Sequence, residues 1–368
     1  MKKYIAGRIA ALQQKLAQLK LDAALIYDRE NLIYFAGAAD LEGGVLCVPA
    51  QGEAEIFCLW VEAAYMRQST GLKVIGYPFP AETQSTMAAK WLAGLGLSAP
   101  RVGFTRYFIS LKDYQCLRGA IPGMVVGDIA IPCYQLRSVK VPEEIDRIRQ
   151  ASKALTAGMD AAVATVKAGI PEYEVLAEAE YAMGKAGSQG SSFRMQVLAH
   201  SRQMNIHPYA GKALLEDNAP VVIHLGATVE GYGAKMCRTV FLGNPPEECV
   251  RIYQVLKKVQ DAAVAALMPG VTCAEVYDAA AEVIRQEGYE RQWLMEHIGY
   301  GVGIRQSEFY PIISKDSPVV LEENMVVDLL LPTIYKPGLG GPRITDTILM
   351  TDQGPRYLTE YNREVIMK

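Results

Sequence analysis

The chain contains 368 residues, half of which are hydrophobic, and carries a formal net charge of −3. This length favours two domains, and the interleaving of acidic and basic residues argues against a nucleic-acid-binding surface. No segment reaches the run of about 18 apolar residues that predicts a membrane span. We therefore expect no membrane association, and a small molecule or a peptide as the ligand.

The seven cysteines are dispersed, odd in number and free of C-x-x-C spacing. This pattern favours a reduced, cytoplasmic chain over one stabilised by disulfides. The opening residues, MKKYIAGRIAALQQK, begin like a signal peptide, but Arg8 and the glutamines interrupt any apolar stretch. We interpret this segment as an amphipathic helix.

From residue 1 to about residue 127, short apolar runs alternate with helical patterns. The alternation predicts an α/β layer domain. No glycine-rich nucleotide-binding pattern follows any of its strands, because GLGLS at 94–98 lacks the lysine of a phosphate-binding loop. The predicted strands are 23–27, 43–50, 54–60, 72–77, 101–104 and 124–127, and the predicted helices are 6–19, 61–69, 82–95 and 110–119.

A helix start marks the boundary between the two domains. Pro142 suits a first helical turn, where its missing N–H costs nothing, and the next residues, Glu143 and Glu144, face the positive end of the helix dipole. A long helix therefore begins at Pro142. We place the two domains at residues 1–135 and 136–368.

The second domain repeats itself at an offset of 101 residues. Residues 160–187 match residues 261–288, with Gly169 in register with Gly270 and Gly187 with Gly288. Each half offers two amphipathic helices that feed a β-rich segment. The natural assembly is a pseudo-twofold α/β sandwich with a site between its halves.

Several segments resemble the pita-bread superfamily, which includes aminopeptidase P, prolidase, methionine aminopeptidase and creatinase (peptidase family M24). Residues 1–135 resemble the creatinase/prolidase-type N-terminal domain, in which a helix and a strand precede an N-x-x-Y-x-x-G turn, here Asn31 to Gly37. The resemblance implies an α/β (α+β) fold, with that domain followed by a pita-bread domain, and a homodimer. It is carried by LRSVKVPEEIDRIR (136–149), a hairpin at 220–239 with its turn at Glu230-Gly231, HIGYGVG (297–303), ENMVVDLLLPTIY (323–335) and GGPRITDTILMT (340–351).

In metal-dependent members, five side chains hold a pair of divalent cations. The matching positions in this chain are His224, Lys235, Tyr300, Leu330 and Thr345. An ammonium has no lone pair, so Lys235 cannot ligate a cation while it is protonated. We therefore expect no metal and no other cofactor. The alternative is a metal shell recruited from His200, His207 and His224.

The loss of carboxylates inverts the expected charge of the site. Lys235, together with Arg194, Arg238, Arg305 and Arg343, predicts a pocket that favours an anion. Either a bound anion or a nearby acid such as Asp346 would keep Lys235 protonated, unless its flexible stem turns to solvent. The predicted substrate-binding residues are His224, Lys235, Tyr300, Arg305, Arg343 and Thr345.

His207 lies where aminopeptidase P and creatinase keep a catalytic histidine, and Glu308 matches the acid of the family's His-Glu pair, with Ser307 in place of the histidine. The resemblance implies that His207 is a general acid/base with Glu308 as its partner. A hydrogen-bonded structural role for His207 is the alternative. Cys237 is interpreted as a packing residue, or else as a thiol activated by Lys235 or Arg238.

Two functions from different classes follow. The first is a metal-independent, creatinase-like hydrolase or lyase acting on a small carboxylated C–N compound. The second is a non-catalytic pseudo-peptidase that binds a peptide or a small anion, as the histone-binding domain of the FACT large subunit reuses the fold. The remaining alternative is an Xaa-Pro peptidase with an unusual metal shell.

Overall fold

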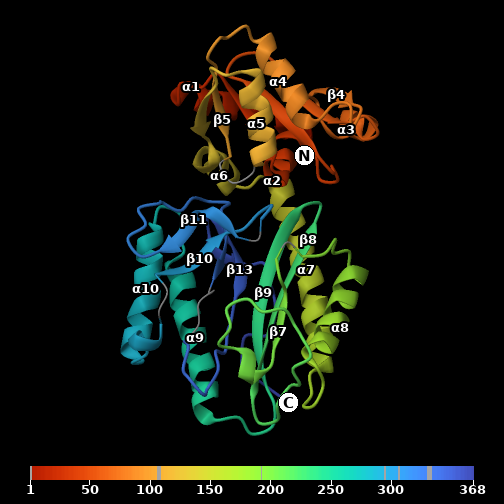
Figure 1. Ribbon diagram of the computed structural model, residues 1–368. Helices are drawn as coiled ribbons and strands as arrows, with labels where there is room; N and C mark the ends of the chain where they lie inside the picture. The colour runs from red at the N-terminus through yellow and green to blue at the C-terminus, as the bar shows by residue number, and fades with distance from the viewer. Residues whose placement is uncertain (1, 106–108, 192, 294–295, 306, 330–333) are drawn as a thin grey trace. The chain divides into compact units, whose positions relative to one another are not determined.

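The computed structural model describes residues 2–105, 109–191, 193–293, 296–305, 307–329 and 334–368. The chain forms two compact units, Met1–Arg137 and Ser138–Lys368 (Figure 1). Their boundary lies two residues after the one placed at 135/136. Among the described helices, none combines the length and the apolar character that a membrane crossing requires.

The N-terminal unit is built on a six-stranded sheet in the order β4-β3-β2-β1-β5-β6. The central strands β1 and β2 are buried along their whole length, as their apolar runs predict. The strands are β1 (Ala23–Ile26), β2 (Gly44–Pro49), β3 (Glu55–Leu59), β4 (Lys73–Tyr77), β5 (Arg101–Phe104) and β6 (Val125–Asp128), and the helices are α1 (Ile5–Gln18), α2 (Arg29–Ala36), α3 (Ala63–Ser69), α4 (Gln84–Gly94), α5 (Leu111–Ala120) and α6 (Ala130–Ser138).

The expected N-x-x-Y-x-x-G turn is instead the body of helix α2. Asp28 caps the start of this helix by accepting a hydrogen bond from the backbone N–H of Asn31. Gly37 ends the helix in the left-handed conformation at φ 71°, which glycine adopts without a steric penalty. The prediction therefore located the chain reversal but missed the two helical turns before it.

The C-terminal unit contains two sheets, one in the order β15-β9-β8-β7 and the other in the order β11-β10-β12-β13-β14. Helices α7 and α8 cover the first sheet, and α9 and α10 cover the second (Figure 1). The helices are α7 (Pro142–Thr165), α8 (Glu172–Lys185), α9 (Glu247–Ala266) and α10 (Cys273–Gln286), and the strands are β7 (Gln196–Leu198), β8 (Pro220–Val229), β9 (Tyr232–Phe241), β10 (His297–Gly301), β11 (Glu308–Ser314), β12 (Val326–Leu329), β13 (Asp346–Thr351), β14 (Gly354–Tyr357) and β15 (Ile366–Met367).

The internal repeat is present in the backbone as well as in the sequence. Gly169 and Gly270 both have positive φ angles, 82° and 91°, and precede the second helix of each half. The N–H of Gly169 donates to the carbonyl of Leu215, and the N–H of Gly270 donates to that of Leu321, both at 2.8 Å. The expectation of an α/β sandwich built from two similar halves is confirmed.

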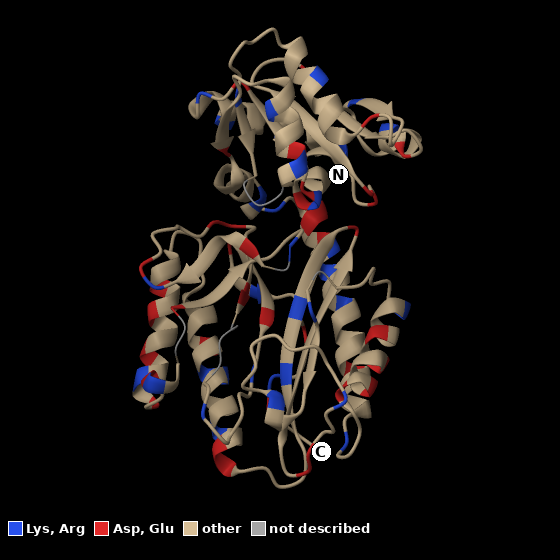
Figure 2. Cartoon of the chain, in the orientation of Figure 1, with Lys and Arg blue, Asp and Glu red and all other residues tan. Residues whose placement is uncertain are grey.

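The outer helices α8 and α10 carry mostly acidic side chains along their length (Figure 2). Each of these helices has at least one acidic residue in its first turn and a basic residue in its last turn. Charges placed in this way interact favourably with the helix dipole.

The hairpin of β8 and β9 brings the candidate site together. Glu230 and Gly231 both have positive φ angles, 46° and 83°, which is the backbone of a two-residue type I′ turn. The two strands pair along ten residues each, from Val229 opposite Tyr232 to Pro220 opposite Phe241. Because side chains alternate along a strand, residues on β9 face two different environments.

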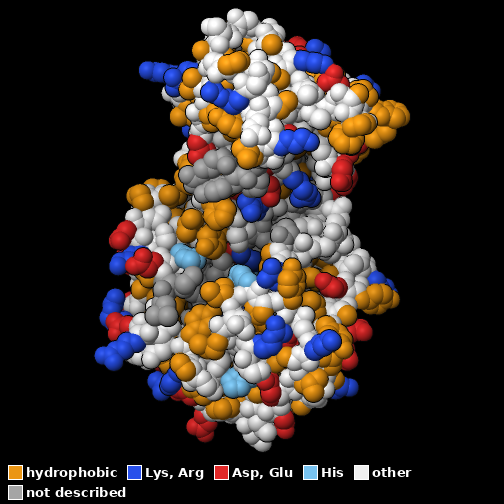
Figure 3. Space-filling view, in the orientation of Figure 1, with side chains coloured by type: hydrophobic (Ala, Val, Ile, Leu, Met, Phe, Trp, Pro, Cys, Tyr) orange, Lys and Arg blue, Asp and Glu red, His pale blue; other side chains and the backbone are white. Residues whose placement is uncertain are grey.

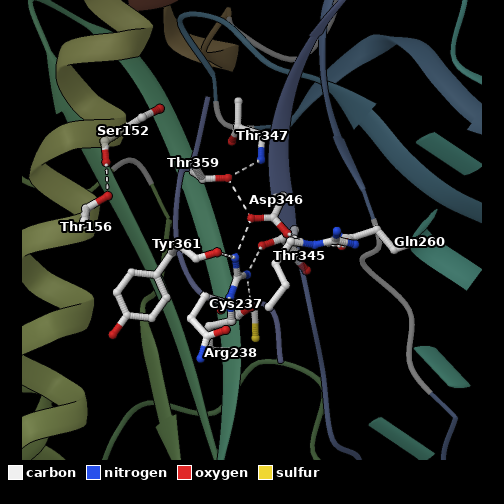
Figure 4. Close-up of polar contacts among 12 residues, drawn as sticks. Ser152, Thr156, Cys237, Arg238, Gln260, Thr345, Asp346, Thr347, Thr359 and Tyr361 are labelled. Atoms are coloured by element: carbon white, nitrogen blue, oxygen red, sulfur yellow. Dashed lines mark hydrogen bonds and ion pairs between the residues drawn. The ribbon is translucent and has the colours of Figure 1, made fainter. Parts of the chain in front are cut away.

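One face of β9 carries a buried ion pair that joins the two sheets (Figure 4). Arg238 Nη2 donates to Asp346 Oδ1 at 2.7 Å, and neither side chain is exposed to solvent. Thr359 donates to the same carboxylate at 2.8 Å, and Arg238 also donates to backbone carbonyls of Thr345 and Asn362. The network therefore ties β9, β13 and the segment before β15 to one another.

We expect Arg238→Met to lower the free energy of unfolding by about 3 to 5 kcal/mol, because it leaves the buried Asp346 carboxylate without its main partner. Denaturant unfolding followed by circular dichroism measures the change. Lys258→Met, which removes the solvent-exposed pair with Glu287, is the matched control and should cost less than about 1 kcal/mol. Equal losses in the two variants would contradict the role given to the Arg238 network.

Candidate active site

A cavity of about 370 Å³ opens within the C-terminal unit between its two sheets. In the space-filling view, that unit is hollowed on the face in view, and histidine and hydrophobic side chains lie at the edge of the hollow (Figure 3). The size suits a small molecule. Its described lining residues are Phe193, Arg194, Ile206, His207, His224, Lys235, Cys237, His297, Tyr300, Ser307, Phe309, Tyr335, Arg343 and Thr345.

An ammonium–carboxylate pair lies at the cavity wall. Lys235 of β9 forms an ion pair with Asp328 of β12, and both side chains are buried, with 3% and 0% of their surface exposed. Lys235 Nζ also donates to Ser307 Oγ at 2.7 Å. Lys235 thus lines the cavity with its ammonium beside an acid, and that acid is Asp328 rather than the expected Asp346.

Asp328 is held in place from the opposite side by β10. Its Oδ1 accepts a hydrogen bond from the backbone N–H of Tyr300 at 2.8 Å. A Cβ on Gly299 would lie 2.1 Å from the Asp328 carbonyl oxygen, so only glycine allows the two strands to approach this closely. Burial raises the pKa of Asp328, and the neighbouring Lys235 opposes that shift.

Tyr300 and His297 form a second polar pair on β10. The Tyr300 hydroxyl lies 2.8 Å from His297 Nε2, and the Lys235 ammonium lies 6.0 Å from the centre of the Tyr300 ring. Burial lowers the pKa of His297 and, with Asp328, raises the pKa of Tyr300. Both side chains are therefore neutral near pH 7, and the tyrosine is a hydrogen-bond partner rather than a charge.

His224 is a neutral polar group at the inner wall. Burial lowers its pKa far below the ordinary value, and the positive charges of Lys235 and Arg343 add to the shift. Its ring packs against Phe193 at 4.7 Å between ring centres. Its Nε2 is buried and makes no hydrogen bond in the described part of the chain. A neutral imidazole placed in this way can donate or accept one hydrogen bond with a ligand.

Arg343 supplies positive charge that no acid neutralises among the described ion pairs. Its guanidinium donates to the carbonyl oxygens of Gln203 and Asn205 and to the side chain of Gln196, and only 6% of its surface is exposed. Its Nε is buried without a hydrogen-bond acceptor among described residues. A planar guanidinium fixed by carbonyl groups suits recognition of a carboxylate.

His207 lies at the cavity rim on the loop after β7. Its Nδ1 lies 2.9 Å from the carbonyl oxygen of Ile206, which only accepts, so Nδ1 carries the proton and Nε2 keeps its lone pair. Burial lowers the pKa of His207, and the charges of Arg343, Arg194 and Lys235 lower it further. The ring is therefore a neutral base near pH 7.

The structure corrects two expectations about this constellation and leaves a third untested. Glu308 and Arg305 are not among the lining residues; the backbone N–H of Arg305 donates to Glu308 Oε1 at 3.2 Å, and His207 has a backbone partner instead of Glu308. Arg238 faces away from the cavity, because it alternates with Cys237 along β9 and pairs with Asp346. The Leu330 position lies outside the described residues.

Thr345 and Cys237 line the cavity side by side. Their backbones exchange two hydrogen bonds, at 3.0 and 3.2 Å, which join β9 to the segment before β13. Burial raises the pKa of Cys237 to about 12. The thiol is thus protonated at neutral pH, and the interpretation of Cys237 as an activated thiolate is not supported by its surroundings.

The described lining residues do not match the needs of a dinuclear metal site. They include no aspartate or glutamate, and the Lys235 ammonium occupies one of the five expected ligand positions. No cluster of three His, Cys, Asp or Glu side chains suitable for a metal ion occurs in the described part of the chain. His200, which the alternative metal shell would require, does not line the cavity.

Three functional candidates were missed in the sequence. Asp328 lies in the segment 323–335, where only position 330 was given a role, Ser307 was noted only as a replacement, and His297 was given no role. The buried aspartate in MVVDLLL carried a usable signal, because a carboxylate flanked by apolar residues is almost never fully buried without a partner. Its partner Lys235 lies 93 residues away in sequence, so spacing could not identify the pair.

Comparison with known proteins places both units in one family. Residues 146–352, more than half of the chain, match Metallopeptidase family M24, and residues 8–139 match the Creatinase/Prolidase N-terminal domain. A curated Xaa-Pro dipeptidase from Pyrococcus furiosus is 29% identical over 98% of this chain and 99% of its own length. A solved Xaa-Pro dipeptidase from Bacillus anthracis superposes with a TM-score of 0.90 at 25% identity, covering 99% of this chain and 100% of that one.

The same architecture occurs in a protein of a different kind. The N-terminal domain of a FACT complex subunit from Cicer arietinum (chickpea) superposes with a TM-score of 0.81 over 100% of this chain and 99% of that one. Its 14% identity shows a shared fold alone. The expected combination of a creatinase-type N-terminal domain and a pita-bread domain is confirmed, and the chain belongs to Metallopeptidase family M24.

Proposed function

We propose that this protein is a metal-independent hydrolase that cleaves an amide-like C–N bond in a small carboxylated compound. The observation that carries the proposal is the buried Lys235–Asp328 pair, which brings an ammonium to a position where metal-dependent relatives of the superfamily are expected to hold cations. Because the acid neutralises this ammonium, Lys235 is stabilised in the cavity without a metal and without a bound anion.

Recognition of the ligand is assigned to Arg343 and His224. The guanidinium offers charge that is not neutralised by an acid in the described structure, and the imidazole offers one neutral polar atom. A carboxylate accepts hydrogen bonds from both kinds of group. The aromatic side chains of Phe193, Phe309 and Tyr335 then contact the apolar part of the ligand.

Proton transfer is assigned to His207. Its Nε2 lone pair is available because Nδ1 is bonded to the Ile206 carbonyl. Such a base can remove a proton from an attacking water molecule. Glu308 plays no part in this assignment, because its carboxylate faces the backbone of Arg305 instead of the His207 ring.

The second candidate is binding without turnover. The observation in its favour is that the described lining contains no carboxylate to orient His207, whose ring is anchored only by the carbonyl of its own neighbour. A cavity of this kind retains ligand recognition through Arg343 while catalysis is weak or absent. The turnover experiment below separates the two candidates.

We expect hydrolysis of at least one compound among Xaa-Pro dipeptides, N-acyl amino acids and guanidino acids, measured as amine release by mass spectrometry in the presence of EDTA. His207→Gln should lower kcat/KM by about 100-fold or more, because it removes the base. His200→Gln, a histidine outside the cavity, is the control and should retain activity. A compound that raises Tm but is never converted would support the binding candidate instead.

Purified protein should contain no stoichiometric zinc, manganese, cobalt or iron, because the described lining offers no carboxylate ligand. Elemental analysis by mass spectrometry measures the metal content, and thermal denaturation with and without EDTA measures its contribution to stability. Two transition-metal ions per chain, or a Tm lowered by EDTA, would show that a metal site exists and refute the proposal.

The pKa of His207 should lie below its ordinary value of about 6.5, because burial and the nearby cations disfavour the imidazolium. Proton or nitrogen NMR of the ring measures it directly. Arg343→Met should raise this pKa, since it removes one of the cations. The acidic limb of the pH–rate profile, where His207 gains a proton and stops acting as a base, should move to higher pH in the same variant. An unchanged His207 pKa in Arg343→Met would contradict the assignment.

A further inference from the structure

Ser307 lies at the cavity wall in direct contact with the buried ion pair. Its Oγ is 2.7 Å from Lys235 Nζ, and Lys235 in turn contacts the Asp328 carboxylate. Ser307 is half-buried and lines the cavity, so its hydroxyl is accessible to a ligand. Ser307 lies in the turn before β11, Lys235 lies on β9 and Asp328 lies on β12.

We propose that Ser307 is a nucleophile activated by Lys235, and that cleavage of the C–N bond passes through an acyl-enzyme on Ser307. This inference rests on the proposed hydrolase function and specifies how that function is performed. The arrangement meets the general criterion for covalent catalysis, because nucleophile and base lie within hydrogen-bond distance and a third group orients the base. Serine–lysine pairs are one of the recurring variants of such catalysis.

Asp328 makes the lysine a usable base. An ammonium has three donors and no lone pair, so Lys235 must lose a proton before it can accept one from Ser307. The Asp328 carboxylate contacts Nζ directly, and burial raises its pKa. Transfer of one proton from Lys235 to Asp328 leaves both groups of the pair neutral. The amine then directs its lone pair at the Ser307 hydroxyl.

The proposed step conserves atoms and charge. Ser307 Oγ attacks the carbonyl carbon, its proton passes to Lys235, and the carbonyl electron pair moves to oxygen. Collapse of the tetrahedral intermediate breaks the C–N bond, and the Lys235 ammonium returns the proton to the leaving nitrogen. His207 then takes a proton from a water molecule that attacks the ester, the bond from the carbonyl carbon to Ser307 Oγ breaks, and His207 returns the proton to Oγ as the carboxylic acid is released.

Other groups in the cavity fit this role less well. The Cys237 thiol is held protonated by burial, which raises its pKa to about 12. Thr345 is 1% exposed, and its backbone is engaged with that of Cys237. The Tyr300 hydroxyl is directed at His297, at 2.8 Å from its Nε2. Ser307 is the described hydroxyl that combines access from the cavity with contact to a buried amine.

The test is reaction of the full-length protein with a fluorophosphonate probe, which modifies activated serines. We expect one adduct per chain by intact mass and its location at Ser307 by peptide mapping. Ser307→Ala should abolish labelling, whereas Ser314→Ala, at the far end of strand β11 and outside the cavity, should label as the wild type does. A folded wild-type protein with no adduct, or with an adduct at another residue, would overturn the proposal.

The contribution of Lys235 is tested in the double variant Lys235→Met/Asp328→Leu. It replaces both members of the buried pair with apolar groups, which proteins often tolerate where a single replacement would leave an unpaired charge. Labelling of Ser307 should slow by about 100-fold or more, because the base is absent. Labelling at the wild-type rate in the folded double variant would overturn the activation by Lys235.

Failure of this inference is distinguishable from failure of the proposed function. Turnover of a carboxylated compound by a protein that the probe does not label would remove Ser307 as nucleophile and leave the hydrolase standing. Labelling of Ser307 without turnover of any carboxylated compound would support the nucleophile and contradict the proposed substrate class.

Discussion

The ion pair between Lys235 and Asp328 is the interaction on which the candidate site depends. It joins β9 of one sheet to β12 of the other, at the wall of the cavity. Either charge alone would be strongly disfavoured in this buried position, and removal of one partner would leave the other without compensation. Lys235 in one half of the pseudo-twofold unit and Asp328 in the other half therefore depend on each other. Gly299 contributes to it, since a side chain there would prevent β10 from reaching the backbone next to Asp328.

The same pair determines the charge that a ligand meets. Because Asp328 neutralises Lys235, the positive charge of the inner cavity comes from Arg343, which carbonyl groups hold in place without cancelling its charge. Histidine protonation adds little, since burial and these cations hold the pKa of His224 far below its ordinary value. The site thus combines the permanent cations Arg343 and Arg194 with neutral imidazoles and aromatic walls. Its electrostatics differ from those of a metal centre, in which several carboxylates surround dications.

Much of the architecture could be predicted from the sequence, because it depends on local patterns. Apolar runs located the six strands of the N-terminal sheet, Pro142 located the long helix, and Glu230-Gly231 located the hairpin turn. The site was predicted less completely. His224, Lys235 and Arg343 line the cavity as expected, but Arg238 does not, since a one-residue difference along β9 reverses the direction of a side chain. The partner of Lys235 was assigned to Asp346 instead of Asp328, because both aspartates lie in buried strands, and sequence does not show which one faces the cavity.

The backbone of the hairpin and the chemistry of the side chains on it are specified independently, for a physical reason. The β8/β9 hairpin is specified by a turn with two positive φ angles and by backbone pairing over ten residues per strand, and neither depends on whether an inward side chain is a carboxylate or an ammonium. The identity of the inward side chain does determine which neighbours can stabilise that side chain. A lysine at position 235 requires a buried acid within reach, and Asp328 is that acid. Fold and site chemistry are thus specified by separate groups of residues in this unit, so membership of a metallopeptidase family establishes the first without establishing the second.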